Sequence, residues 1–338
     1  MDHCPRRIAC TGPSASCAYC GCRQTRPCET CPVRCCWRKD ADLWLKDIGG
    51  SLDLDGVWWP KVRMPALPPL VPVLASSFRR LPDWPAWGVR WDRVLSKSGR
   101  HIQRRWLRGN PQEVLGVPPG VAVVATLIGP DPVIESLWTY QWQDRIWDGL
   151  ARARFSVVIG PNYSVYGDHP RFEHRLNIKR SILAAARMRM FGVPAVPSVY
   201  VWRMEDVGAL ARWGNEVGLD ALAVNFQTFY NHREWGRVLP LLLALRDAMP
   251  KGVRWFFPGV SSRERIEVLR ELFPGAVFLT LRPYECAAHG RRLRADGKEE
   301  RMLARPEDLL EENLRVVARW AESERSEGNA TDTVPVRV

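Results

Sequence analysis

Cysteines crowd the first 36 residues of this chain, which hold nine of its ten. They include two Cys-x-x-Cys pairs, Cys17/Cys20 and Cys28/Cys31, with seven residues between them. Two thiolates from each of two tight turns can complete a tetrahedral zinc site, and a [4Fe–4S] cluster also takes four thiolates. The thiolates that we expect to bind metal are Cys17, Cys20, Cys22, Cys28, Cys31 and Cys35.

The identity of the metal stays open between zinc and an iron–sulfur cluster. The cysteines outnumber the ligands of one zinc site and their spacings vary, which favours the cluster. Disulfides are not expected, because the N-terminus lacks the apolar core of a signal peptide and the chain is predicted to be cytoplasmic. No apolar run reaches the roughly 18 residues that cross a membrane. Cys286 stands alone in a regular region and is predicted to be a buried apolar residue.

A basic, tryptophan-rich zone over residues 78–109 stands out within a net charge of +12. Clustered positive charge attracts polyanions, and arginine with aromatic rings is a typical combination for holding nucleic acid. A solvated basic face around packed tryptophans is the alternative. The residues that we predict to contact DNA or RNA are Arg79, Arg80, Trp91, Arg100, Arg104, Arg105, Trp106 and Arg108.

From residue 118 to about 320, short β-branched runs alternate with longer amphipathic ones, which predicts a parallel sheet with helical crossovers. The expected strands are 121–129, 155–161, 195–202, 221–227, 253–259 and 276–282. Two more strands, from 68–74 and from beyond 285, would complete a TIM-like (β/α) barrel. A distorted or incomplete barrel is also compatible with this pattern. An open doubly wound sheet is the alternative, although no Gly-x-Gly-x-x-Gly follows a strand.

Four zones follow from these patterns. Residues 1–40 are predicted to form a metal-binding module and 41–117 a linker with the basic region. Residues 118–322 are predicted to form the barrel-like α/β domain, and 323–338 a disordered tail.

Polar side chains gather where the predicted strands end, which is the functional face of such a barrel. Amides that hydrogen-bond a planar heterocycle, aromatic rings that stack on it and arginines for phosphate would make a base-binding pocket. The candidate binding residues are Asn162, Tyr163, Tyr166, His169, Arg203, Asn225, Gln227, Arg282 and Tyr284. Asp131 and Asp168 are the candidate nucleophiles, although Asp168 also suits a helix cap. The amides could equally serve backbone groups at the barrel rim.

Residues 161–166, Pro-Asn-Tyr-Ser-Val-Tyr, resemble a motif of an uncharacterised family of bacteria and their phages. Members carry a strand ending in Pro-Asp-Phe-Ser-x-Tyr, then a helix and a Gly-x-x-x-x-Pro strand, which corresponds here to 192–197. The resemblance covers about residues 150–290 and implies the fold and a mobile-element context. The family's Asp is Asn162 here, which argues against an essential carboxylate at that position.

A barrel, a bound metal and a basic surface together are also similar to the tRNA-guanine transglycosylases and their phage relatives. Those enzymes place their cysteines after most of the barrel and in another order, so this likeness concerns the fold alone. Three functions remain as predictions: a base-exchange enzyme acting on DNA or RNA, a non-catalytic nucleic-acid-binding protein, and an iron–sulfur redox or radical enzyme. A protein partner that supplies catalytic groups is a further possibility.

Overall fold

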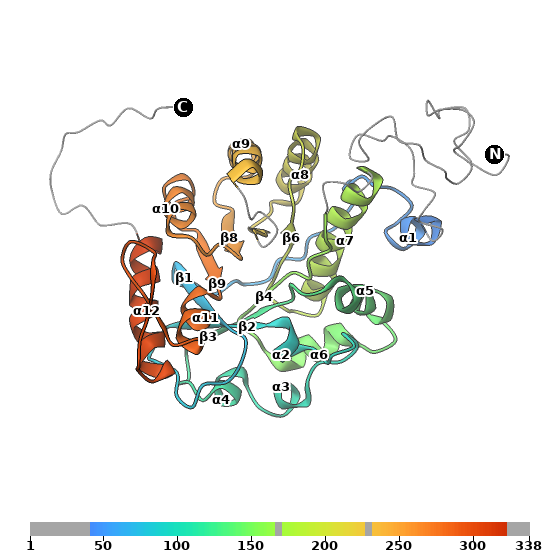
Figure 1. The fold of residues 1–338 in the computed structure, drawn as a ribbon. Coiled ribbons are helices and arrows are strands. Elements are labelled where there is room, and N and C mark those ends of the chain that lie inside the picture. The colour runs from blue at the N-terminus through green and yellow to red at the C-terminus, as the bar shows by residue number, and fades with distance from the viewer. Residues whose placement is uncertain (1–40, 166–170, 227–231, 323–338) are drawn as a thin grey trace, which may run out of the picture.

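The computed structural model describes residues 41–165, 171–226 and 232–322. In this part of the chain nine parallel strands form one sheet, in the order β5-β4-β3-β2-β1-β9-β8-β7-β6. The helices lie in a ring around the strands (Figure 1). A mixed α/β architecture with a barrel-like parallel sheet is therefore confirmed, and it is consistent with a TIM-like fold.

The strands are short and rich in β-branched residues, and almost all of their residues are buried. Such near-continuous apolar runs suit a parallel sheet that is covered on both faces. The strands of the sheet are β1 (Leu70–Leu74), β2 (Ala86–Arg90), β3 (Ala122–Thr126), β4 (Val157–Ile159), β5 (Ala195–Val196), β6 (Ser198–Val199), β7 (Ala221–Val224), β8 (Arg254–Pro258) and β9 (Val277–Thr280). A separate antiparallel hairpin consists of β10 (Arg291–Leu293) and β11 (Glu299–Arg301).

Helices follow most strands and return the chain to the start of the next one. They are α1 (Ala41–Asp47), α2 (Trp91–Val94), α3 (Arg104–Arg108), α4 (Pro111–Leu115), α5 (Asp131–Tyr140), α6 (Ile146–Ala153), α7 (Arg171–Met190), α8 (Met204–Val217), α9 (His232–Ala248), α10 (Arg263–Leu272), α11 (Arg282–Ala288) and α12 (Pro306–Ala321). Within the described ranges, no helix combines the length and the apolar character that crossing a membrane requires.

Strand β1 joins the last strand of the sheet to the earliest part of the barrel. It pairs with β9 in parallel, Leu70 opposite Phe278 and Pro72 opposite Thr280, and with β2 on its other side. The predicted strand at 68–74 is therefore confirmed. This pairing connects the two halves of the sheet. Because all neighbouring strands in the sheet are parallel, their carboxyl ends lie at one end of the barrel.

Strand β2 was missed by the sequence analysis. It lies inside the basic zone, where Gly88 interrupts a five-residue run and the flanking arginines hide its pattern. Its glycine is required, because a Cβ there would come within 2.8 Å of the Val73 side chain on β1. Two strands of the sheet, β1 and β2, thus lie within the predicted linker and basic region of 41–117. Among the described residues beyond 285, none adds a strand to the sheet, and residues 291–301 form the β10–β11 hairpin instead.

A proline splits the strand predicted at 195–202. Pro197 has no N–H group to donate to a ladder, and the residues on its two sides pair with different neighbours. Strand β5 pairs with β4, whereas β6 pairs with β7. This five-residue stretch therefore links the two ends of the sheet order through the chain itself.

Two apolar layers hold the fold together. Val71, Val124 and Phe256 belong to a cluster contributed by alternate residues of the strands, which fills the barrel interior. The opposite faces of the same strands pack against the helices in a second, larger cluster that includes Val123 and Phe257. The interior is a packed core, as the layers of branched side chains in such barrels are.

The segment before β1 is attached to the barrel by a buried arginine. The Arg189 guanidinium on α7 donates to the Ala195 and Pro60 carbonyls, at 2.8 and 3.1 Å, and is paired with Asp220. It also lies 4.0 Å from the ring centre of Trp59, whose indole N–H donates to Asp220. Arginine suits such a site because its planar fork can satisfy several acceptors and stack on a ring at once.

The tryptophans of the basic zone are mainly structural. Trp87 on β2 and Trp106 on α3 are fully buried. The Trp106 indole N–H donates to the Arg93 carbonyl, and its ring lies 5.0 Å from that of Phe155. Trp106 therefore presents no face on which a base could stack, which corrects its prediction as a nucleic-acid contact.

Replacing Trp106 by Ala should lower the free energy of unfolding by about 3–5 kcal/mol, because a large buried ring and its hydrogen bond are lost. Trp58, which is 65% exposed, is the matched control, and Trp58→Ala should change stability by about 0.5 kcal/mol or less. Urea denaturation followed by circular dichroism measures both. Equally small losses of stability in both variants would contradict the burial of the Trp106 ring.

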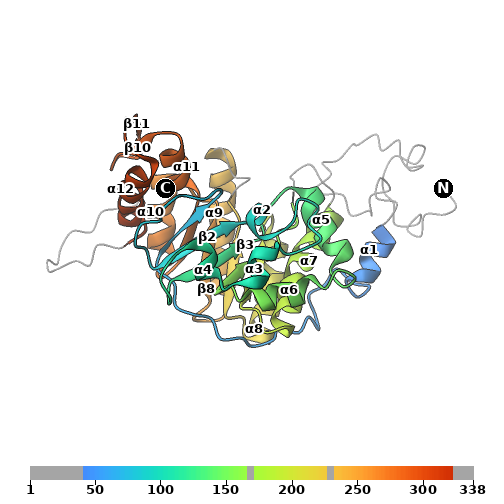
Figure 2. The same cartoon turned by 90° about the horizontal axis from the view of Figure 1, so that it is seen from below.

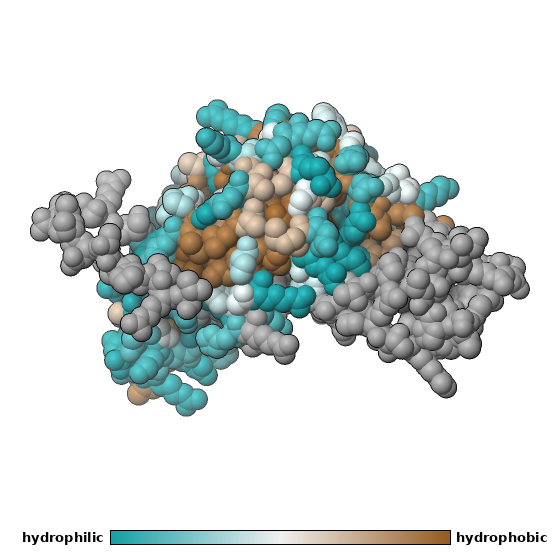
Figure 3. Space-filling model, turned by 90° about the horizontal axis from the view of Figure 1, so that it is seen from above, coloured by the Kyte–Doolittle hydropathy of each residue, from teal (hydrophilic) through white to brown (hydrophobic). Residues whose placement is uncertain are grey.

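Apolar surface gathers in the middle of the face seen from above in Figure 3, the side on which α8, α9 and α10 lie. Helix α9 carries three half-buried leucines, Leu239, Leu241 and Leu243. Polar residues border this area.

Candidate functional site

The mouth of the barrel, which we define as the end where the strands finish, carries polar side chains above an apolar floor. Ile128, Ile159 and Leu279 belong to the interior cluster that closes the barrel below it. Functional groups of TIM-like barrels lie at this end because the loops that follow the strands can vary without disturbing the sheet.

Four polar residues from β4, β6 and β7 form a buried network at the mouth. The Tyr200 hydroxyl accepts hydrogen bonds from the Asn162 and Asn225 amides, at 3.2 and 3.0 Å. The Ser198 hydroxyl donates to the Asn162 carbonyl oxygen at 3.3 Å. All four side chains are at most 4% exposed. The structure thus brings together the predicted Asn162 and Asn225, and adds Ser198 and Tyr200, which the sequence analysis did not single out.

Asp131 lies beside the same network, at the first position of α5 after β3. Its carboxylate accepts a 2.6 Å hydrogen bond from the Ser164 hydroxyl, which follows β4. Helix α7 fixes this loop, because the Asn177 amide donates to the Ser164 carbonyl at 2.6 Å and the Ser181 hydroxyl accepts from the Tyr163 N–H at 3.3 Å. The predicted nucleophile is therefore half-buried, oriented and adjacent to the Asn162 strand end.

Trp91 and Arg90 occupy the rim where β2 ends. The half-buried Trp91 ring packs on Gly129, two residues before Asp131, and a Cβ at Gly129 would meet that ring at 2.7 Å. Arg90 follows the inward-facing positions of β2 and forms a two-point ion pair with Asp92, with one N–O distance of 2.9 Å. The Asp92 hydrogen bond raises the pKa of Arg90, against the lowering effect of burial.

Tyr163 does not face the mouth, which corrects its assignment as a binding residue. Its side chain is 1% exposed and packs edge-on against Trp138, with 5.6 Å between ring centres. The Arg180 guanidinium stacks on it at 4.0 Å and is paired with Glu135. Burial raises the pKa of the Tyr163 hydroxyl, which finds no hydrogen-bond partner in the described structure. This cluster supports the site from behind.

Arg282 and Tyr284 belong to helix α11 and serve mainly structural contacts. Arg282 is paired with Glu299 of the hairpin at 2.7 Å. The Tyr284 hydroxyl shares a hydrogen bond with the Ser76 hydroxyl after β1, and its ring packs edge-on against Phe78. The Tyr284 hydroxyl is thus occupied by Ser76, whereas the buried Arg282 Nε has no hydrogen-bond partner among the described residues, so a binding role for Arg282 stays a prediction.

Arg203 and Cys286 were also singled out by the sequence analysis, and both lie in the described part of the chain. Arg203 precedes α8, and its backbone N–H donates to Asp206, which is paired with Arg171. Cys286 is 3% exposed, as predicted, and burial raises the pKa of its thiol to about 11. It therefore stays protonated at neutral pH.

The remaining residues predicted to bind substrate or metal, or to act as nucleophile, fall outside the described ranges. They are Tyr166, Asp168, His169, Gln227 and the cysteines Cys17, Cys20, Cys22, Cys28, Cys31 and Cys35. Among the residues that the structure does describe, no group of three His, Cys, Asp or Glu side chains is placed to hold a metal ion.

The predicted nucleic-acid contacts divide by their surroundings. Arg79, Arg80, Arg104, Arg105 and Arg108 are exposed. Arg100 is instead paired with Asp144 at 2.7 Å and stacks on Tyr140, and Arg105 donates to the Arg93 carbonyl at 2.9 Å.

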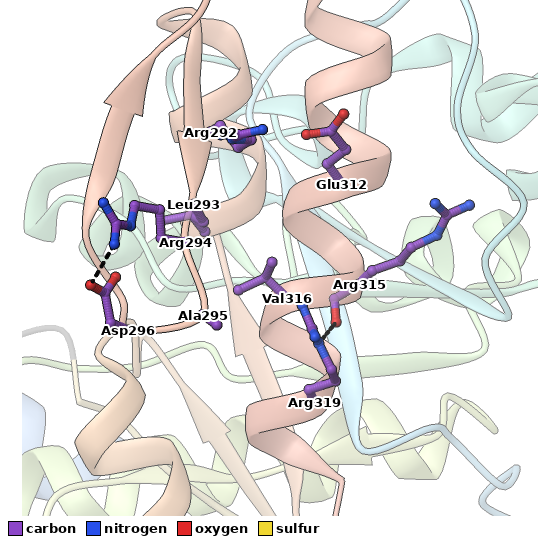
Figure 4. A pocket seen from close by; sticks show the side chains of 9 residues that line it. All are labelled: Arg292, Leu293, Arg294, Ala295, Asp296, Glu312, Arg315, Val316 and Arg319. Carbon is purple, nitrogen blue, oxygen red and sulfur yellow. Dashed lines mark hydrogen bonds and ion pairs between the residues drawn. The ribbon is translucent and has the colours of Figure 1, made fainter.

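A groove of about 580 Å³ lies elsewhere, between α12 and the β10–β11 hairpin. Arginines line it, but Figure 4 shows Arg294 turned to Asp296 and Arg319 turned to the Arg315 carbonyl. Glu300 and Glu311 hold two more of the lining arginines, Arg292 and Arg315. The positive charge of this groove is largely compensated.

No known protein family matches the chain, and no curated protein matches it either. The likeness to the uncharacterised phage family and to the transglycosylases therefore stays a prediction.

Tyr200→Phe should lower the free energy of unfolding by about 1–3 kcal/mol, because it removes the acceptor that two buried amides share. Tyr140→Phe is the control, since that ring stacks beneath Arg100 and the structure gives its hydroxyl no hydrogen bond to a described residue. Thermal unfolding followed by calorimetry compares them. A Tyr200→Phe variant as stable as the wild type would show that the network contributes nothing to folding.

Proposed function

We propose that the protein acts on nucleic acid and takes a nucleobase at the mouth of its barrel. The observation that carries this proposal is the arrangement of Trp91, Asp131 and the amide–phenol network of Asn162, Tyr200 and Asn225 around one apolar floor. An aromatic ring, amides and a carboxylate are the groups that stack on, hydrogen-bond and attack a base-bearing sugar.

Charge supports the same proposal. The chain carries a net charge of +12, and exposed arginines follow β1 at Arg79 and Arg80. A base within a duplex must leave its stack to reach a pocket, so such an enzyme needs a grip on the strand beside the pocket. Arg90 at the rim, although paired with Asp92, keeps a guanidinium that is about one third exposed.

The reaction that fits best is base exchange by glycosyl transfer. The Asp131 carboxylate would attack the sugar C1′ as the bond to the base breaks, and the departing base would take a proton from water. An incoming base would then displace the carboxylate at C1′ and lose its own proton. The Ser164 hydrogen bond holds the Asp131 oxygen in place for such an attack.

Asp131→Asn should abolish incorporation of a labelled free base into DNA or RNA, by about a thousandfold or more, because the amide is not a nucleophile. Adenine, guanine, cytosine and uracil are each offered, with genomic DNA and total RNA as acceptors. Ser164→Ala is the matched variant: it keeps the carboxylate, removes its hydrogen bond and should retain part of the activity. An Asp131→Asn variant with wild-type incorporation would dismiss this nucleophile.

Non-catalytic nucleic-acid binding is the second candidate, and one observation favours it. Three described carboxylates near the mouth are each held by a neighbour: Asp92 by Arg90, Asp131 by Ser164 and Asp206 by Arg171. A wild-type protein that binds nucleic acid tightly but exchanges none of the four bases would select this function.

The metal site belongs to the proposal as well. The cysteines of residues 17–35 would bind zinc or an iron–sulfur cluster and fold the N-terminal segment, whose arginines Arg23, Arg26, Arg34 and Arg38 would extend the basic surface. The chemistry supplied by zinc there is structural, and a cluster could also carry an electron.

Anaerobically purified protein should contain metal, and the replacement of Cys28 and Cys31 by Ser should remove it, because two of four thiolate ligands are lost. Cys286→Ser is the control and should keep the metal, since that thiol is buried and protonated. Absorption near roughly 400 nm would identify a cluster, and a colourless protein with zinc would identify a structural site. Metal-free wild-type protein would refute the prediction.

A further inference from the structure

The short helices α3 and α6 lie side by side on the outer wall of the barrel, although 37 residues stand between Arg108, the end of α3, and Ile146, the start of α6. Figures 1 and 2 both show them adjacent. Trp106 of α3 packs against Phe155 beyond α6, with ring centres 5.0 Å apart. Gly149 allows α6 to approach closely, since a Cβ there would come within 2.8 Å of the Ile102 side chain.

This packing brings four exposed arginines onto one wall: Arg104, Arg108, Arg152 and Arg154. Arg104 and Arg108 are one helical turn apart, on the side of α3 opposite the buried Trp106. Arg152 lies on the outer side of α6, whose Leu150 and Ala153 are buried, and Arg154 ends that helix. We refer to these four residues as the α3–α6 wall.

The arginines of the α3–α6 wall differ from the nearby Arg100 and Arg145 in having no carboxylate partner among the described residues. Arg100 and Arg145 nearby are each held by an aspartate, Asp144 and Asp148, at 2.7 Å. Four like charges placed together repel one another, and they are not needed to bury any surface. An anionic partner that contacts all four arginines would therefore relieve this repulsion and bind favourably.

We infer that the α3–α6 wall is a docking surface for the phosphate backbone of a nucleic acid duplex, an inference that rests on the proposed function. A guanidinium binds a phosphate through two parallel hydrogen bonds. A duplex also presents phosphates from both strands at a higher charge density than a single strand does, and so releases more counterions when arginines replace them.

The wall contacts phosphates and reads no bases. Its large aromatic residues, Trp106 and Trp147, are at most 1% exposed and cannot stack on an unpaired base. Stacking is available instead at the rim, where Trp91 is half-buried. The structure thus separates a sequence-independent grip on the wall from contact with a base at the mouth.

The test is the salt dependence of binding to a fluorescent DNA duplex of mixed sequence, followed by anisotropy between roughly 50 and 200 mM salt. Replacing all four wall arginines by Gln should weaken binding at the lower salt concentration by about a hundredfold or more. It should also reduce the slope of log K against log salt by about three to four, since each lost phosphate contact removes about 0.9.

The matched control removes four positive charges elsewhere, through Arg212→Gln, Lys251→Gln, Lys298→Gln and Arg301→Gln. These residues are exposed on α8, on the turn before β8 and on the hairpin, and the structure gives their side chains no ion pair within the described ranges. Thermal unfolding confirms that both variants fold. The control should keep nearly the wild-type slope.

Three outcomes would overturn the inference, and they separate it from the proposed function. Wild-type binding by the wall variant removes the inference alone, as does an equal loss in the wall and control variants, which would reduce the effect to net charge. A wild-type protein that binds neither this duplex nor total RNA at any salt concentration removes both. Asp131→Asn bears on the mouth only, and it should abolish base exchange while the salt slope stays that of the wild type.

Discussion

The pairing of β1 with β9 is the constraint on which the rest of the structure depends. It joins residues 70–72 to residues 278–280, more than 200 positions along the chain, and it holds the early, basic region in register with the late strands. Because the whole sheet is parallel, this one contact decides that every strand ends at the same mouth. Asn162, Tyr200 and Asn225 follow different strands, and they come into contact because the sheet curves until its two ends, β5 and β6, lie together.

Buried arginines carry the next level of organisation. Arg180 and Arg189 lie on one helix, α7, and each satisfies its charge with a carboxylate while it stacks on aromatic rings. A buried ion pair of this kind adds less to stability than its contacts suggest, because both charges lose their water. Its larger effect is on position: Arg180 fixes the ring behind the β4 loop, and Arg189 fixes the segment before β1.

Much of this architecture could be predicted from the sequence, because β-branched runs and helical stripes dominate residues 118–320. Strand β2 could not, since AWGVR is short, contains a glycine and lies among arginines. The site was foreseen in part: Asn162, Asn225 and Asp131 follow apolar runs, which marks them as strand ends. The inward or outward direction of a side chain beyond a strand was not foreseeable, and Tyr163 next to Asn162 turns into the core. Burial of Trp106 likewise depends on Phe155, a contact that no local pattern encodes.

The break at Pro197 has a mechanical consequence. Strands β5 and β6 are consecutive parts of one stretch, and each pairs with a neighbour on one side only, so backbone pairing is incomplete along this stretch, which we call the seam. The Tyr200 hydroxyl, together with the amides of Asn162 and Asn225, bridges the strand ends on both sides of this seam. The side chains that face the mouth thus also hold the strand ends of the barrel together. A ligand that competed for these hydrogen bonds would weaken the link between the strand ends at the seam. Occupancy of the mouth would therefore change the rigidity of the barrel at β5 and β6.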